Sequence, residues 1–174
     1  MSADDRRSFD LPAFLDRVQR AAEAARVFGV VEVRGDTLRA SAPKAAAEAW
    51  YRLVRDTGTN GADATSGRWH VEFVTPDRWL SESIEADLMH HGDPIEELVE
   101  EELVELSSEP RGTRRDRAAI ERPTVQHFRS DDLLYTFRTP LAGDPPSADE
   151  ATRYLLAYEA AFRELGDVEA DPDE

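Results

Sequence analysis

Residues 30–41 read VVEVRGDTLRAS, and this stretch predicts the sheet around which the rest of the fold is organised. Apolar and polar side chains alternate on both sides of Gly35-Asp36, a pair that suits a tight type II′ turn, so we expect a two-stranded hairpin. The tight turn would pair residues across the strands as follows: Val33 with Leu38, Val31 with Ala40, and Glu32 with Arg39. One face of this hairpin is therefore expected to lie on a core and the other to face water.

Amphipathic segments on both sides of the hairpin predict helices. They are expected at residues 10–25, 43–57, 77–91, 93–106 and 147–165. Asp10 is placed to cap the first helix, and Ser147 with Glu150 forms a capping box for the last. The helix at 43–57 rests on one stripe of apolar residues: Ala46, Ala47, Trp50, Leu53 and Val54. The helix at 77–91 is expected to turn its own apolar stripe inward: Trp79, Leu80, Ile84 and Leu88.

Two further segments predict strands. Trp69, Val71 and Phe73 alternate with their neighbours, as in a half-buried strand, and residues 124–130 and 133–139 form a second hairpin around Asp131-Asp132. We therefore expect one α+β domain over residues 1–166, with an antiparallel sheet of about five strands and helices packed on one face. The segments 57–66 and 107–122 are predicted to be exposed loops, and the acidic tail 167–174 to be disordered.

Charge and composition exclude several classes of protein. The net charge is −16 over 174 residues, and Lys44 is the only lysine among 21 basic residues, a pattern that fits adaptation to high intracellular salt. The chain has no cysteine, which excludes disulfides, thiol nucleophiles and thiolate metal sites. We expect a cytoplasmic protein, because the charged N-terminus is unlike a signal peptide and no apolar run approaches the length of a membrane span. The acidic surface argues against nucleic-acid and membrane partners, even though the 107–122 loop carries five arginines.

The end of the chain carries a resemblance to a known family. The stretch HFRSDDLLYTFRTPL at 127–141 is followed by a capped amphipathic helix. If the helix at 43–57 is an insertion, the order becomes helix, three strands, long helix, two strands and helix. This order is similar to type III secretion chaperone-like domains, including the YbjN-type bacterial proteins. The resemblance is one of topology; it implies an acidic, often dimeric domain that binds polypeptide segments without catalysis.

The second hairpin supplies the candidate binding residues. A two-residue turn would pair Arg129 with Leu134 and His127 with Thr136, and would put Arg138 on the same face. If the strand at 69–74 lies in the same sheet, its polar face adds His70 and Glu72. We expect this face to bind an acidic peptide or another anion through bidentate arginine contacts. The alternative, that these arginines only neutralise neighbouring acids, stays open at this point.

A second alternative is a metal site. His70, Glu72 and His127 are nitrogen and oxygen ligands of the kind that a catalytic zinc accepts. His90 and His91 are better explained as helix-terminal residues beside Gly92. Since no catalytic motif is present, the sequence favours a non-catalytic protein-binding or chaperone-like adaptor without a cofactor, expected to be a homodimer. A small enzyme or metal-binding protein centred on His70 and His127 is the alternative.

Overall fold

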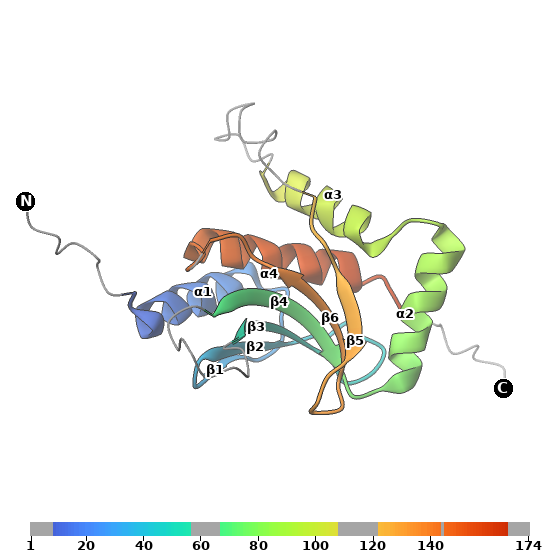
Figure 1. Cartoon of the computed structure of the whole chain (residues 1–174), viewed down its shortest axis with the longest axis horizontal. Helices are drawn as coiled ribbons and strands as arrows, with labels where there is room; N and C mark the ends of the chain where they lie inside the picture. The colour runs from blue at the N-terminus through green and yellow to red at the C-terminus, as the bar shows by residue number, and fades with distance from the viewer. Residues whose placement is uncertain (1–8, 57–66, 108–121, 144, 167–174) are drawn as a thin grey trace, which may run out of the picture.

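The computed structural model describes residues 9–56, 67–107, 122–143 and 145–166 (Figure 1). Its elements, in chain order, are α1 (Leu11–Ala25), β1 (Val31–Arg34), β2 (Thr37–Ser41), β3 (Trp50–Asp56), β4 (Arg68–Thr75), α2 (Arg78–His91), α3 (Ile95–Ser107), β5 (Gln126–Arg129), β6 (Tyr135–Pro140) and α4 (Ala148–Phe162). The loop expected at 57–66, most of the loop at 107–122 and the tail at 167–174 lie outside these residues. No helix in the described part of the chain is long and apolar enough to cross a membrane.

One antiparallel sheet organises the fold. Its six strands follow the order β1-β2-β3-β4-β6-β5. Helices α1 and α4 pack on one face, α3 lies on the outer side of α4, and α2 stands at the end of the sheet (Figure 1). The predicted α+β class, with helices on one face of an antiparallel sheet, is confirmed, with six strands rather than five. None of the described helices covers the other face, which is called the open face below.

The first hairpin has the predicted register. Val33 pairs with Leu38, and Glu32 pairs with Arg39. Gly35 has a φ of 63°, a left-handed conformation that a side chain would disfavour and that a tight hairpin turn requires. Leu38 is fully buried, so the apolar face lies on the core as expected.

The helix predicted at 43–57 is wrong. Residues 50–56 form β3, which pairs with β2 and β4 on its two sides. Tyr51 and Leu53 are buried, and their neighbours Trp50 and Arg52 lie on the open face. This alternation is a strand period, and pairing on both sides outweighs the helix propensity of the alanines before it. Four strands therefore precede α2, where the resemblance takes three.

The core fills the space between the sheet and the two helices that cover it. Phe73 of β4 stacks on Phe162 of α4 with ring centroids 4.7 Å apart, and Trp69 meets Phe14 of α1 edge-on at 5.1 Å. The hydroxyl of Tyr158, deep in this layer, shares a 2.6 Å hydrogen bond with Thr139. Burial raises the pKa of Tyr158, so this hydroxyl stays neutral.

Helix α2 begins and ends as the sequence predicts, but one of its faces was misassigned. The Asp77 side chain accepts from the Leu80 N–H at its N-terminus, and Gly92 closes it in a left-handed conformation. The prediction that Trp79 points inward is wrong, because 78 % of Trp79 is exposed. The far end of α4 is tied to α2 through Gly166, whose N–H donates to the Asp87 carboxylate at 2.6 Å.

Candidate functional site

A single row of polar side chains crosses the open face. The strand registers align one residue from each strand in this row: Glu32, Arg39, Arg52, Glu72, Arg138 and Gln126. Because directly opposed residues in antiparallel strands lie about 4.5–5.5 Å apart, neighbours in the row are within side-chain reach. The row therefore crosses the whole sheet with two acids, three arginines and one glutamine, and Arg39 lies directly beside Arg52.

Glu72 is the centre of this row and is fully buried. Arg52 donates to one carboxylate oxygen at 2.7 and 3.0 Å. The Arg138 Nε donates to the other oxygen at 2.7 Å, and its Nη2 forms an ion pair with that oxygen at 2.5 Å. Asp132 lies 3.6 Å from Arg52, and Asp56 lies 3.5 Å from Arg138. The result is a chain of five charges in which each arginine has an acid on both sides.

Arg138, His70 and Glu72 lie on the open face, as predicted, but Arg138 is already paired with Glu72 and Asp56. Its guanidinium also lies 5.2 Å from the centre of the Phe128 ring. For this residue the geometry favours the alternative interpretation, in which the arginine neutralises neighbouring acids. An incoming anion would have to displace a buried carboxylate to bind it.

The predicted register of the second hairpin is wrong by one residue. His127 pairs with Phe137 and Arg129 with Tyr135, instead of with Thr136 and Leu134. Since side chains alternate between faces, a shift of one residue moves His127 and Arg129 to the side of Phe137, away from Arg138. The cause lies in the turn, which spans Ser130 to Leu134 and includes Leu133 at a φ of 64°. The five predicted site residues are thus divided between the two faces.

The predicted metal site fails for the same reason. His127 lies on the opposite face from His70 and Glu72, and the described residues contain no cluster of three His, Asp or Glu side chains that could hold a metal ion. His70 is itself buried, and its Nδ1 has no hydrogen-bond partner in the described part of the chain. Burial first, and then the charge of Arg138, lower the pKa of His70, so the ring is held neutral.

His127 instead forms a contact that the sequence did not suggest. Its Nδ1 lies 2.8 Å from the Glu85 carboxylate and its Nε2 lies 3.2 Å from the Ser81 hydroxyl, both on α2. The ring stacks on Phe137 with centroids 3.9 Å apart. In a catalytic triad the serine likewise lies at Nε2 of the histidine and the acid at Nδ1. However, Ser81 is only 1 % exposed and its N–H bonds to the Asp77 carbonyl, so no substrate carbonyl reaches the hydroxyl. The contact joins α2 to the edge of the sheet.

A groove lies at the other end of the open face, beside β1. Its volume is about 350 Å³, and it is lined by Val30, Glu32, Arg34, Arg39, Ser41, Glu48 and Trp50. The Arg39 guanidinium carbon lies over the Trp50 ring, 3.7 Å from its centre. Among the described residues it makes no hydrogen bond or ion pair, while Arg34 is paired with Glu32 at 2.8 Å. Burial first, then the neighbouring Arg34 and Arg52 charges, lower the pKa of Arg39 against the opposing effect of Glu32 and Glu48.

Sequence reasoning missed this groove because it placed Trp50 on a helix. Trp50 lies on β3 and pairs with Ser41 of β2, which brings its ring beside Arg39. The signal that could have revealed it is the alternation of residues 50–54, WYRLV, in which every second side chain is buried.

Comparisons with known proteins give this chain no relative: no family model, no curated protein and no solved structure matches it. Its function must therefore be argued from its own geometry.

Proposed function

We propose that this protein is a non-catalytic, protein-binding adaptor whose open sheet face takes up an acidic segment of a partner at the groove formed by Arg39 and Trp50. The observation that supports it is the Arg39 guanidinium, which none of the described residues pairs with in a hydrogen bond or ion pair, in a protein whose acids outnumber its bases. Of the arginines on the cross-strand row, Arg52 and Arg138 are held by Glu72 and its neighbours. Within the described part of the chain, Arg39 is the arginine of that row whose hydrogen-bond donors have no acceptor and are available to a ligand.

The surroundings of Arg39 suit a carboxylate. A guanidinium can donate two parallel hydrogen bonds to one carboxylate, and stacking on Trp50 holds it in place before the ligand arrives. Val30, 69 % exposed at the rim of the groove, and the ring of Trp50 offer apolar contact beside the charge. The groove thus fits a carboxylate carried next to an apolar side chain.

The net charge of the protein limits which ligands fit. At −16, the protein repels polyanions, whose many charges would meet the whole surface. A short segment with one acidic residue meets mainly the local field at Arg39, and salt screens the rest beyond about 8 Å at physiological ionic strength. A peptide with isolated acidic residues is therefore the favoured ligand class.

The experiment is a selection from a random peptide library against three forms of the protein. Wild type and Arg129→Gln should select peptides that carry Asp or Glu next to an apolar residue, whereas Arg39→Gln should not. Arg129→Gln is the matched control, because it makes the same charge change on the opposite face of the sheet. For a selected peptide, we expect Arg39→Gln to weaken binding about 10- to 100-fold, the loss of one charge-assisted contact. Equal selection by all three proteins, or no selected peptide, would contradict the proposal.

This role agrees with the one that the resemblance to type III secretion chaperone-like domains implies. A homodimeric state, a cytoplasmic location and adaptation to high salt stay predictions of the sequence.

A further inference from the structure

β1 is an edge strand, and half of its backbone hydrogen-bonding groups face away from the other described strands. It pairs with β2 on one side and ends the sheet on the other. The Gln19 side chain of α1 donates to the Val31 carbonyl at 3.2 Å, so this carbonyl points away from β2. Because such groups alternate along an antiparallel strand, the N–H and carbonyl of Val33 point the same way. The backbone N–H and carbonyl of Val33 are therefore available to an incoming strand, whereas the carbonyl of Val31 is already bonded by Gln19.

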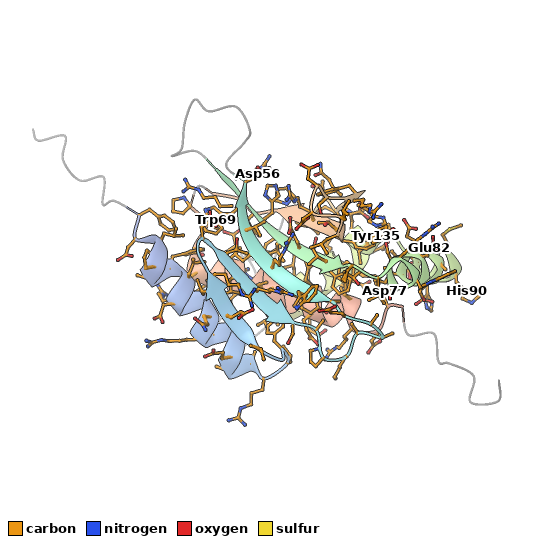
Figure 2. The ribbon with its side chains drawn as sticks, turned by 90° about the horizontal axis from the view of Figure 1, so that it is seen from below. Asp56, Trp69, Asp77, Glu82, His90 and Tyr135 are labelled. Atoms are coloured by element: carbon orange, nitrogen blue, oxygen red, sulfur yellow. The ribbon has the colours of Figure 1, made fainter. Side chains whose placement is uncertain are left out.

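Helix α1 forms a wall beside this edge. Seen from the open face, α1 runs along the outside of the β1–β2 hairpin (Figure 2). A second pocket of about 210 Å³ lies between α1 and β1, on the face opposite the Arg39 groove. Leu11, Pro12 and Leu15 of α1 line it together with Val33, which is 37 % exposed. The edge of β1 is thus flanked by an apolar pocket on one face and by the arginine groove on the other.

A β-strand fits this arrangement because its side chains alternate between the two faces. We propose that the partner segment binds as an extended strand added antiparallel to β1, with apolar side chains toward α1 and an acidic side chain toward Arg34 and Arg39. The proposal rests on the proposed function and specifies its mode of recognition. Antiparallel addition continues the pairing of every strand in the sheet.

Charge fixes the register of the added strand. If an apolar residue lies opposite Val33, the flanking residues lie opposite Glu32 and Arg34, which share the open face. An acid is favoured opposite Arg34 and disfavoured opposite Glu32. The sequence Val-Glu-Val-Ser-Val, read antiparallel with its central valine at Val33, meets both conditions.

A partner peptide fits this edge better than a second copy of the chain. Two-fold pairing of β1 with β1 would bring both α1 helices to the same side of the sheet, beside the same axis. Each α1 already runs along the outside of its own hairpin (Figure 2). The two helices would therefore compete for the same space above the paired β1 strands. A single extended segment from a partner leaves that space to one α1 helix.

The test uses the full chain and the capped peptide Ac-Val-Glu-Val-Ser-Val-NH2, followed by amide chemical shifts in an NMR titration. In antiparallel addition the backbone groups of the peptide's valines face β1, and those of Glu and Ser face away. N-methylation of the central valine should therefore weaken binding about tenfold or more, whereas N-methylation of Glu and Ser should leave it unchanged. Equal binding of the peptides N-methylated at the central valine, at Glu and at Ser would overturn strand addition.

Two variants of the protein test the same edge. Val33→Pro removes the N–H that points away from β2. The hydrogen bonds to β2 are made by the residues on either side of Val33, so they are kept, and proline is tolerated at such edge positions. Val33→Ala keeps the N–H and serves as the control, so we expect the first to weaken binding more than the second. If Val33→Pro fails to fold, the N-methylated peptides still decide the question.

The outcomes separate the two proposals. Binding that depends on Arg39 but ignores N-methylation would overturn strand addition and leave the groove function standing. Binding that depends on N-methylation but ignores Arg39→Gln would support strand addition and contradict the groove. A dimer in light scattering that Val33→Pro converts to a monomer would show that a second copy occupies the edge, and would overturn the peptide proposal.

Discussion

Replacing Glu72 by glutamine should be among the most damaging conservative changes in this protein. Glu72 is fully buried and accepts two N–H bonds from Arg52 and one from Arg138, whose Nη2 also forms an ion pair with it. Glutamine keeps the shape but turns an amide group, itself a donor, toward one guanidinium and removes the charge from between both. Removing one partner of a buried ion pair costs about 3–5 kcal/mol. We expect about 3 kcal/mol, because Asp132 and Asp56 still face the two arginines.

The assay is urea unfolding with the free energy extrapolated to water, at about 0.15 M and about 1 M salt. A loss of about 3 kcal/mol is a large part of the 5–15 kcal/mol typical of a domain. Two effects have opposite signs: removing one of the excess negative charges relieves repulsion slightly, whereas the broken network destabilises. Only the repulsion is strongly screened by salt, so the loss should persist at high salt.

Glu82→Gln is the matched control, since Glu82 is half-exposed and bonds Arg78 at 2.7 Å within one helix. Such a pair contributes about 0.3–0.5 kcal/mol. The reasoning is refuted if the two variants lose the same stability, or if the Glu72→Gln loss disappears at high salt.

Three further predictions concern other buried polar groups. Because the pKa of His70 is lowered in the folded protein, the unfolded chain takes up a proton at this histidine first as the pH falls. The free energy of unfolding should therefore decrease as the pH falls from about 7 to about 5. In urea midpoints measured against pH, His70→Asn should flatten this slope. Burial raises the pKa of Glu159, so the stability that its protonated form contributes is lost as the pH rises above about 4.5, opposite in sign to the effect of His70. Glu159→Gln should therefore raise the urea midpoint at pH 7. An unchanged or lower midpoint would contradict this. Ser81→Ala should cost about 0.5–1.5 kcal/mol through loss of the His127 contact, and wild-type Ser81 should not react with a fluorophosphonate; labelling detected by mass spectrometry would show a nucleophile instead.

The parts of the fold that the sequence predicts well are those fixed by local chemistry. Gly35 and the alternation around it determine the first hairpin and its register, and Asp10 and Ser147 cap their helices as expected. Each of these features depends on side chains within a few residues of one another. A pattern read from a short window is enough to define them.

The segment at 50–56 could not be predicted in this way because its structure depends on distant partners. Trp50, Leu53 and Val54 fit a helical stripe as well as Tyr51 and Leu53 fit a strand. What decides is that β2 and β4 each offer an edge to this segment, and β4 comes later in the chain. Tertiary pairing of this kind outweighs helix propensity, which differs by less than about 1 kcal/mol per residue.

The candidate site depended on the least predictable quantity, the length of one turn. A two-residue turn at Asp131-Asp132 would have put His127 and Arg129 beside Arg138, whereas the actual turn includes Leu133 in a left-handed conformation. Leucine is an unusual residue for that conformation, so the sequence gives no signal for it. A shift of one residue then exchanges the faces of the whole strand.

The misplaced helix and the shifted register together explain why the proposed binding surface lies at the other end of the sheet from the predicted one. Arg138 was a candidate because the predicted register put it on one face with His127 and Arg129, and the structure shows that Glu72 and Asp56 hold it. Arg39 was not among the predicted site residues. Glu32 lies opposite Arg39 but bonds Arg34 instead, and Trp50, on a strand rather than a helix, holds the Arg39 guanidinium. In a protein with so many acids, the proposed binding role falls to an arginine that has no acid partner among the described residues, and only the pairing of all six strands decides which arginine that is.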